Sequence, residues 1–381
     1  MERFWFVTVH PEWQKLGADE KGFVNLSRRH EFHSDSDPTE NVFGEATFCS
    51  HTFKTVDNVF SFRRNEELRG DVRCADKGVS IQLIAPSAER KVASATSVVA
   101  TEEKIFLACN DGRVRVSDDG TEWKSIDAQT SSVNAVDVFP SGRVVLSGSD
   151  TGELRIVALP DDSVGDSSVF VLPRLHTRPV TGVVVDIASD ARGRQVWSSS
   201  RDGSVRLWDV SQQACLEVHN ADGPVHALAR TCTGVVAACD GAFYLIDSRD
   251  KRVARQVESK RVTSVTTLTP YTVAIGTQHG VVDVYDVRKL ECPLRRFATE
   301  STPVTALAGT PQGVWCGTEV GTCFFLPVDR SGAGNDDSTR MQAPMFTATG
   351  TDCESVRALC LSREGTLLSL CADEVLRCYR I

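Results

Sequence analysis

From about residue 79 to its end, the chain alternates short apolar runs with polar turns. Gln195 to Ser200 and Ser204 to Val210 are two such runs, and Arg201-Asp202-Gly203 lies between them. β-Branched, aromatic and small residues alternate along the runs, and glycine at the turn tolerates a positive φ. No helical period recurs within this region, so the pattern predicts an all-β fold.

A module that opens with a Val-rich strand recurs seven times. The opening strands are marked at residues 97, 133, 180, 225, 262, 304 and 356, at steps of 36 to 52 residues. In each module a second strand meets a tight turn, and a third strand follows. These steps scatter around the ~40–45 residue period of four-stranded WD40 blades, and Leu207-Trp208-Asp209 resembles their signature. The sequence therefore predicts a seven-bladed WD40 β-propeller.

The seventh module predicts how the ring closes. It ends with its third strand, Val375 to Ile381, so its outer strand must come from elsewhere in the chain. The run Val79 to Ile84 has no partner in a module, and we expect it to pair with residues 375–381 and remove the open edge. The propeller then spans residues 77–381. Residues 1–76 lack the module, and their many aromatic residues indicate a small N-terminal domain with an aromatic core. The polar composition of residues 330–344 indicates a mobile loop.

Composition and charge limit the function. Formal net charge is −9, which disfavours binding to nucleic acid or an anionic membrane and suits a basic partner. No apolar run reaches the ~20 residues of a membrane span. The 13 cysteines show no C-x-x-C pair, so we expect free thiols, no metal and no cofactor. We expect a monomer in the cytoplasm, with the nucleus as a further location.

One module contains a set of polar residues that could be mistaken for a catalytic triad. His176, Ser198, Asp202 and Trp208 stand where WD40 blades have a buried hydrogen-bond chain. A Ser-His-Asp hydrolase is the alternative, but no G-x-S-x-G motif is present. P-loop, dinucleotide-binding, zinc-protease and EF-hand motifs are also lacking in the sequence. We therefore expect a structural chain and a protein that is not an enzyme.

The tight turns between second and third strands emerge on one face of a propeller. Carboxylates are frequent in these turns, and a ring of them would attract a Lys- or Arg-rich partner. The alternative is that Asp and Gly simply suit tight turns. Asp202 is set apart because the hydrogen-bond chain occupies it. The residues predicted to bind a partner are Asp111, Asp150, Arg201, Asp240, Glu319, Asp373 and Glu374.

Two segments offer a different partner. Asp247 with Arg249, and Asp286 with Arg288, resemble the WDxR boxes by which some WD40 proteins bind the adaptor of a cullin ubiquitin ligase. This resemblance implies a substrate receptor as the alternative function. The same residues at the end of a third strand also suit a surface ion pair, worth ~0–1 kcal/mol.

Several stretches resemble the proteasomal ATPase-associated factor family. They are residues 138–148, 199–209, 214–216, 274–278, 286–288, 349–353 and 377–380. The resemblance implies a non-catalytic assembly chaperone of the proteasome regulatory particle. Such a protein would bind the C-terminal domain of a proteasomal ATPase subunit through one face of the propeller.

Overall fold

The computed structural model describes most of the chain from residue 79 onward and a set of strands before it. The described residues are 2–3, 6–9, 13, 21–29, 39–49, 52–55, 60–64, 69–74, 79–160, 167–187, 194–247, 252–258, 261–299, 302–328, 346–350, 354–362 and 364–381. Every regular element among them is a β-strand. The predicted loop at residues 330–344 lies outside this part of the chain.

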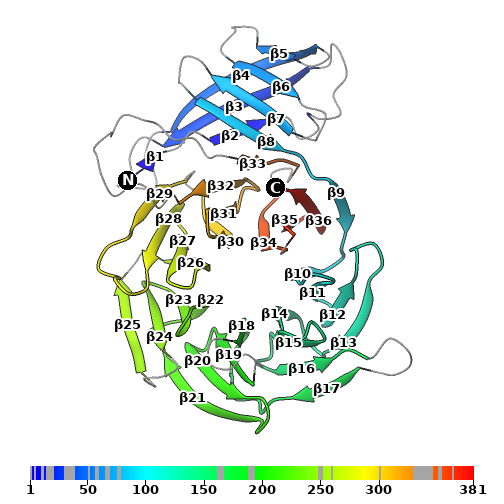
Figure 1. Ribbon diagram of the computed structural model, residues 1–381, viewed down its shortest axis with the longest axis vertical. Helices are drawn as coiled ribbons and strands as arrows, with labels where there is room; N and C mark the ends of the chain where they lie inside the picture. Colours follow the sequence, from blue (N-terminus) through cyan, green and yellow to red (C-terminus); the bar gives the residue numbers. More distant parts are fainter. Residues whose placement is uncertain are drawn as a thin grey trace.

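Seven sheets form a ring of blades around a central axis, as the seven modules predicted (Figure 1). Blades 1 to 3 run from the innermost to the outermost strand as follows. Blade 1 has β10 (Ala95–Ala100), β11 (Ile105–Cys109), β12 (Arg113–Ser117) and β13 (Lys124–Ala128). Blade 2 has β14 (Val133–Val138), β15 (Val144–Ser149), β16 (Leu154–Ala158) and β17 (Ser168–Val171). Blade 3 has β18 (Val180–Asp186), β19 (Gln195–Ser200), β20 (Ser204–Asp209) and β21 (Ala214–Asn220).

Blades 4 to 7 repeat this antiparallel order. Blade 4 has β22 (Val225–Arg230), β23 (Gly234–Cys239), β24 (Ala242–Asp247) and β25 (Arg252–Glu258). Blade 5 has β26 (Val262–Thr269), β27 (Thr272–Thr277), β28 (Val281–Asp286) and β29 (Arg295–Ala298). Blade 6 has β30 (Val304–Thr310), β31 (Gly313–Thr318), β32 (Cys323–Pro327) and β33 (Phe346–Ala348). Blade 7 has β34 (Val356–Leu361), β35 (Thr366–Cys371), β36 (Val375–Arg380) and β9 (Ala88–Lys91).

The closing strand is β9, so the prediction that residues 79–84 pair with 375–381 is wrong. β36 pairs antiparallel with Ala88–Lys91, whereas β8 (Val79–Ile84) pairs with β7 (Arg69–Cys74) and runs parallel to β33. Burial explains the difference. Ile81, Leu83 and Ile84 are almost fully buried, and Ile84 packs into the apolar cluster that contains Trp315 and Phe325 of blade 6. The polar sequence of β9 suits an outermost strand, whose residues are half-buried or exposed.

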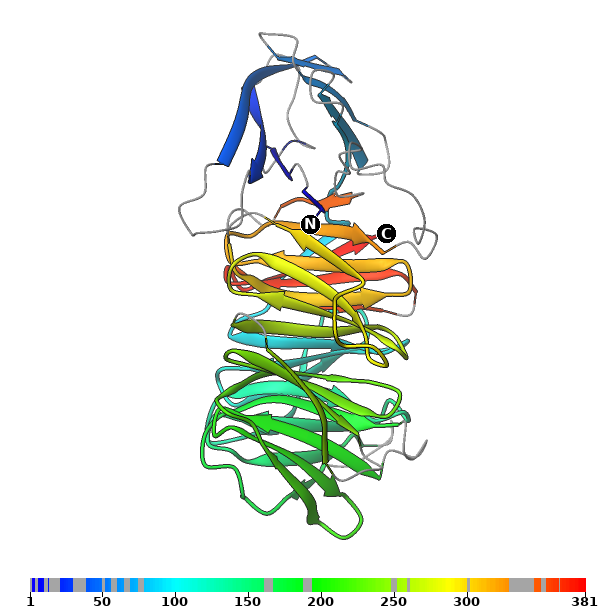
Figure 2. The ribbon, with the colours of Figure 1, turned by 90° about the vertical axis from the view of Figure 1, so that its left-hand side faces the viewer.

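The N-terminal region forms a meander that joins the propeller edge to edge. Its strands are β2 (Phe6–Val9), β3 (Lys21–Arg29), β4 (Thr39–Cys49), β5 (Thr52–Thr55), β6 (Phe60–Arg64), β7 and β8, in that order. The side view shows it at one side of the ring, beside blade 6 (Figure 2). Hydrogen bonding between β7 and β8 crosses the predicted boundary at residue 76, because the apolar strand β8 completes this sheet. A further strand, β1 (Glu2–Arg3), lies parallel to β29 on blade 5.

A repeated irregularity links successive blades near the axis. The register between the first and second strands shifts at the second residue of all seven modules. A β-bulge re-aims the side chain of the extra residue. Thr96 thereby donates to the carbonyl oxygen of Val133 in the next blade, at 2.6 Å. The same link leads from Asn134 to Val180, Thr263 to Val304, Thr305 to Val356, and Arg357 back to Ala95. This last bond joins blade 7 to blade 1.

Apolar side chains between the blades form the core. Trp208, Leu146 and Ile156 pack between blades 2 and 3, and Trp315 with Tyr379 packs between blades 6 and 7. These side chains are at most 4% exposed. Each fully buried side chain of this size contributes about 1.5–3 kcal/mol. The ring therefore holds the turns described below in fixed positions.

Candidate functional site

The turns between second and third strands lie on one face of the ring, together with the connections from each outer strand to the next blade. Main-chain hydrogen bonds join the two sets: Gln129 N donates to Gly112 O at 2.7 Å, and Arg201 N donates to Pro179 O at 3.0 Å. Gly112 has φ +82°, and a Cβ there would lie 2.3 Å from the Gln129 oxygen. Glycine is therefore required where the connection packs on the turn. We call this surface the turn face.

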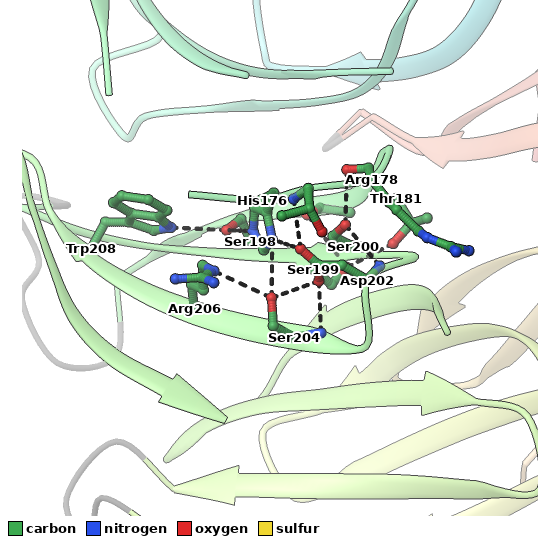
Figure 3. Close-up of polar contacts among 12 residues, drawn as sticks. His176, Arg178, Thr181, Ser198, Ser199, Ser200, Asp202, Ser204, Arg206 and Trp208 are labelled. Carbon is green, nitrogen blue, oxygen red and sulfur yellow. Dashed lines mark hydrogen bonds and ion pairs between the residues drawn. The ribbon is translucent and has the colours of Figure 1, made fainter. Parts of the chain in front are cut away.

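The structure brings together His176, Ser198, Asp202 and Trp208 in blade 3 (Figure 3). The Trp208 indole Nε1–H donates to Ser198 Oγ at 2.8 Å. Ser198 Oγ lies 2.7 Å from His176 Nε2, and His176 Nδ1 lies 3.1 Å from Asp202 Oδ2. With a neutral imidazole protonated at Nδ1, every donor in this chain faces an acceptor. The network ties β19, β20 and the connection before β18 into one unit.

The protonation states fit a structural network. Burial lowers the pKa of His176, and Asp202 counteracts this effect only in part. Burial opposes ionisation of Asp202, but hydrogen bonds from Ser204 and from the Thr177 main chain outweigh it and hold its pKa at about 2. Neutral His176 beside ionised Asp202 is the state that satisfies the hydrogen bonds described above.

This network resembles a hydrolase triad only in its residue types. Ser198 is completely buried, and so is Trp208, to which it is hydrogen-bonded. A nucleophile needs access to a substrate carbonyl and an oxyanion site beside it. Ser198 Oγ instead accepts from an indole inside the blade, so this arrangement supports a structural role for the four residues.

Four carboxylates of the predicted partner-binding ring interact with groups of their own chain. Asp111 forms an ion pair with Arg115 at 2.5 Å, and Asp373 forms one with Arg377 at 2.6 Å. Asp240 lies 2.9 Å from both His226 and Arg261. Glu374, at φ +62°, accepts from the Ser94 main chain. These contacts reduce the negative potential of the turn face.

The remaining members of the predicted ring are exposed. Among the described residues, the Asp150 side chain accepts only a 3.3 Å hydrogen bond from the neutral amide of Asn134. Glu319 and Arg201 are exposed and have no side-chain ion pair with any residue that the structure describes. The strongest unneutralised carboxylates are thus Asp150 and Glu319. Sequence reasoning missed the neutralising arginines, although Arg115 and Arg377 each follow a turn Asp by four residues.

Of the two predicted adaptor-binding boxes, the second lies entirely within the described residues and the first only in part. In the second box, Arg288 Nη2 lies 2.6 Å from Asp286 Oδ2, and its guanidinium carbon is 4.7 Å from the ring centre of Tyr271. This is the surface ion pair that the alternative interpretation expected. In the first box, Asp247 ends β24, and Arg249 lies outside the described residues.

A cavity of about 1270 Å³ lies on the opposite face, between blades 1 and 2. Its lining includes Glu102, Lys104, Asp118, Asp137 and Arg230. Asp137 accepts from the main-chain nitrogens of Val138 and Val185, both at 2.8 Å, and burial raises its pKa. Arg230 donates to the Val185 oxygen at 2.9 Å. Asp137 therefore links blade 2 to blade 3, and Arg230 links blade 4 to blade 3.

The described part of the chain has neither a membrane-spanning helix nor a cluster of metal ligands. No helix there is long and apolar enough to cross a membrane. The same residues contain no cluster of three or more His, Cys, Asp or Glu side chains placed to hold a metal ion.

Comparisons with known proteins agree with the repeat architecture. Residues 120–157 and 169–209 match the family model described as WD domain, G-beta repeat. The chain is similar to the ribosome biogenesis protein YTM1 of Candida glabrata, with 22% identity over 50% of this chain and 42% of the relative. It is also similar to the pre-rRNA-processing protein IPI3 of Mycosarcoma maydis, with 26% identity over 37% of this chain and 28% of the relative. The chain thus spans less than half the length of these relatives.

A solved structure supports the fold. The WD40 β-propeller domain of Doa1 superimposes with a TM-score of 0.63 at 15% identity, covering 77% of this chain and 96% of that one. At this identity the likeness concerns the fold alone. The named relatives are ribosome biogenesis factors, so the expected relation to proteasomal ATPase-associated factors remains a proposal.

Proposed function

We propose that this chain, a seven-bladed propeller with WD40 repeats, is a non-catalytic scaffold for assembling a protein complex. The observation that carries this proposal is the turn face, where the turns of successive blades carry exposed charged side chains. Rigid, preorganised surfaces bind protein partners without a large loss of conformational entropy. Fold alone does not decide the partner, so the partner must be argued from the site.

The specific partner we propose is the C-terminal domain of a proteasomal ATPase subunit, and the role is that of an assembly chaperone of the proteasome regulatory particle. The family resemblance of the sequence supports this choice. Asp150 and Glu319 would contact basic residues of the ATPase domain, because neither carboxylate is neutralised by an arginine in the described part of the chain. A monomer in the cytoplasm or nucleus suits this role.

The test reverses these two charges. Asp150→Lys combined with Glu319→Lys should weaken binding of the ATPase C-terminal domain at least about tenfold at low salt, and less at high salt. The matched control is Glu122→Lys with Glu364→Lys, which changes net charge equally at exposed positions on the opposite face. Titration calorimetry measures both. Equal affinities for the two double variants would contradict the proposed contact.

Ribosome assembly is a second candidate, because the curated relatives are named as ribosome biogenesis and pre-rRNA-processing proteins. Affinity purification at native salt distinguishes the candidates. Proteasomal ATPase subunits among the bound proteins would support the first, and ribosomal precursors would support the second.

The ubiquitin-ligase receptor is the remaining alternative. It predicts that Arg249→Ala combined with Arg288→Ala abolishes binding of the cullin adaptor. The ion pair between Arg288 and Asp286 weakens this alternative, because docking would have to compete with it.

A further inference from the structure

One sector of the turn face is basic although the chain as a whole is acidic. The connection from blade 2 to blade 3 carries Arg174, Leu175 and Arg178, and the adjacent turn of blade 3 carries Arg201. Ser200 Oγ donates to Arg178 O at 2.9 Å, and Arg201 N donates to Pro179 O at 3.0 Å. These bonds place Arg178 and Arg201 on adjacent main chains. We call these four residues the cationic sector.

The arginines of this sector are not neutralised. All three are exposed, and none forms an ion pair with a carboxylate in the part of the chain that the structure describes. Arg115 and Arg377, by contrast, form ion pairs with turn carboxylates. The nearest turn carboxylate, Asp202, is only 10% exposed and is occupied by His176, Thr177 and Ser204.

The segment that carries the arginines is held rigidly. His176 lies between Leu175 and Thr177 and is anchored to Ser198 and Asp202 inside the blade. On the other side, a Cβ at Gly152 would lie 2.4 Å from the His176 carbonyl oxygen, so the segment also packs closely against blade 2. A surface fixed in this way loses little entropy when it binds.

We propose that the cationic sector is a docking site for a short Asp- and Glu-rich protein segment with an apolar residue that contacts Leu175. The guanidinium groups match carboxylates in geometry and charge. Leu175 is 41% exposed between two of the arginines, which favours a peptide that has an apolar side chain. Asp150 and Asp240 in neighbouring turns limit the basic surface, which disfavours a long polyanion such as RNA. The proposal is independent of the ATPase contact proposed above.

The test uses a fluorescent peptide of about twelve residues, composed of Asp and Glu with two Leu, in anisotropy titrations of the full chain. Arg174→Gln, Arg178→Gln and Arg201→Gln together should weaken binding at least about tenfold. The matched control is Lys124→Gln, Lys289→Gln and Arg380→Gln, which removes the same charge from exposed positions on the opposite face. The control should stay within about twofold of the wild type.

Two further arms identify the ligand chemistry. Leu175→Ser keeps all three charges and should weaken binding about threefold, because only the apolar contact is lost. A single-stranded RNA of the same charge should bind more weakly than the peptide. Equal loss in the two triple variants, no measurable binding of the peptide, or tighter binding of the RNA would overturn the proposal. Asp150→Lys with Glu319→Lys should not weaken binding of the peptide. This result would separate the cationic sector from the ATPase contact.

Discussion

Replacing Ser198 by alanine tests whether the buried network of blade 3 is a unit of stability. The change removes the acceptor of the Trp208 indole and the partner of His176 Nε2, which lie 2.8 and 2.7 Å from Ser198 Oγ. Water cannot replace the hydroxyl, because Ser198 and Trp208 are 0% exposed and His176 is 2% exposed. An unsatisfied buried polar group costs about 1–3 kcal/mol, so two of them lower the free energy of unfolding by about 2–6 kcal/mol.

The matched control is Ser147→Ala. Ser147 is equally buried and lies at the equivalent position of blade 2. In the strand register Ser147 lies opposite Arg155, as Ser198 lies opposite Arg206 in blade 3. It accepts one side-chain hydrogen bond, from Gln129 at 2.9 Å, so its loss should cost only about 1 kcal/mol. Urea unfolding followed by tryptophan fluorescence measures both variants, provided that the transition is reversible and its slope unchanged.

A double-mutant cycle separates the network from simple loss of packing. Trp208→Phe removes the indole donor, so one of the two unsatisfied groups that Ser198→Ala creates is no longer present. The double variant should therefore be more stable, by about 1 kcal/mol or more, than the sum of the single effects predicts. The reasoning fails if Ser198→Ala lies within about 0.5 kcal/mol of the wild type, or if the two mutations simply add.

Three other predictions concern pH, domain docking and thiol chemistry. Burial holds the pKa of His176 below its ordinary value, so the unfolded chain binds the proton more readily. The stability that the neutral ring contributes is therefore present above about pH 6.5 and lost below it. His176→Gln should show a smaller loss of melting temperature than the wild type between about pH 7.5 and 5.5. Trp13 is 1% exposed and its indole donates to Thr349 Oγ1 at 2.9 Å. Trp13→Ala should raise hydrogen exchange in β7 and β8 while blades 2 to 4 keep their protection. Cys292 is exposed, whereas burial raises the pKa of Cys109 and of Cys371 to about 11. Labelling by a disulfide reagent, read by mass spectrometry, should be much faster at Cys292, and equal rates would contradict the burial argument.

The sequence by itself determined the repeating part of this protein. Strand pairs such as 195–200 with 204–209, and a glycine in the turn between them, depend on neighbours a few residues away. The signals are therefore local, and each blade repeats them. The contacts of His176, Ser198, Asp202 and Trp208 also follow from their positions within one module.

Only the tertiary structure decided which strand closes the ring and which charges remain free. β8 and β9 are adjacent in sequence, but only β9 pairs with blade 7. In the structure β8 lies between β7 and the outer strand of blade 6, and its Ile84 packs into the apolar cluster of blades 6 and 7. Likewise, Asp240 is neutralised by Arg261 from the next blade, whereas Arg174 and Arg178 face no carboxylate among the described residues. Such pairings depend on distances between modules, and a local pattern of residue types does not determine those distances.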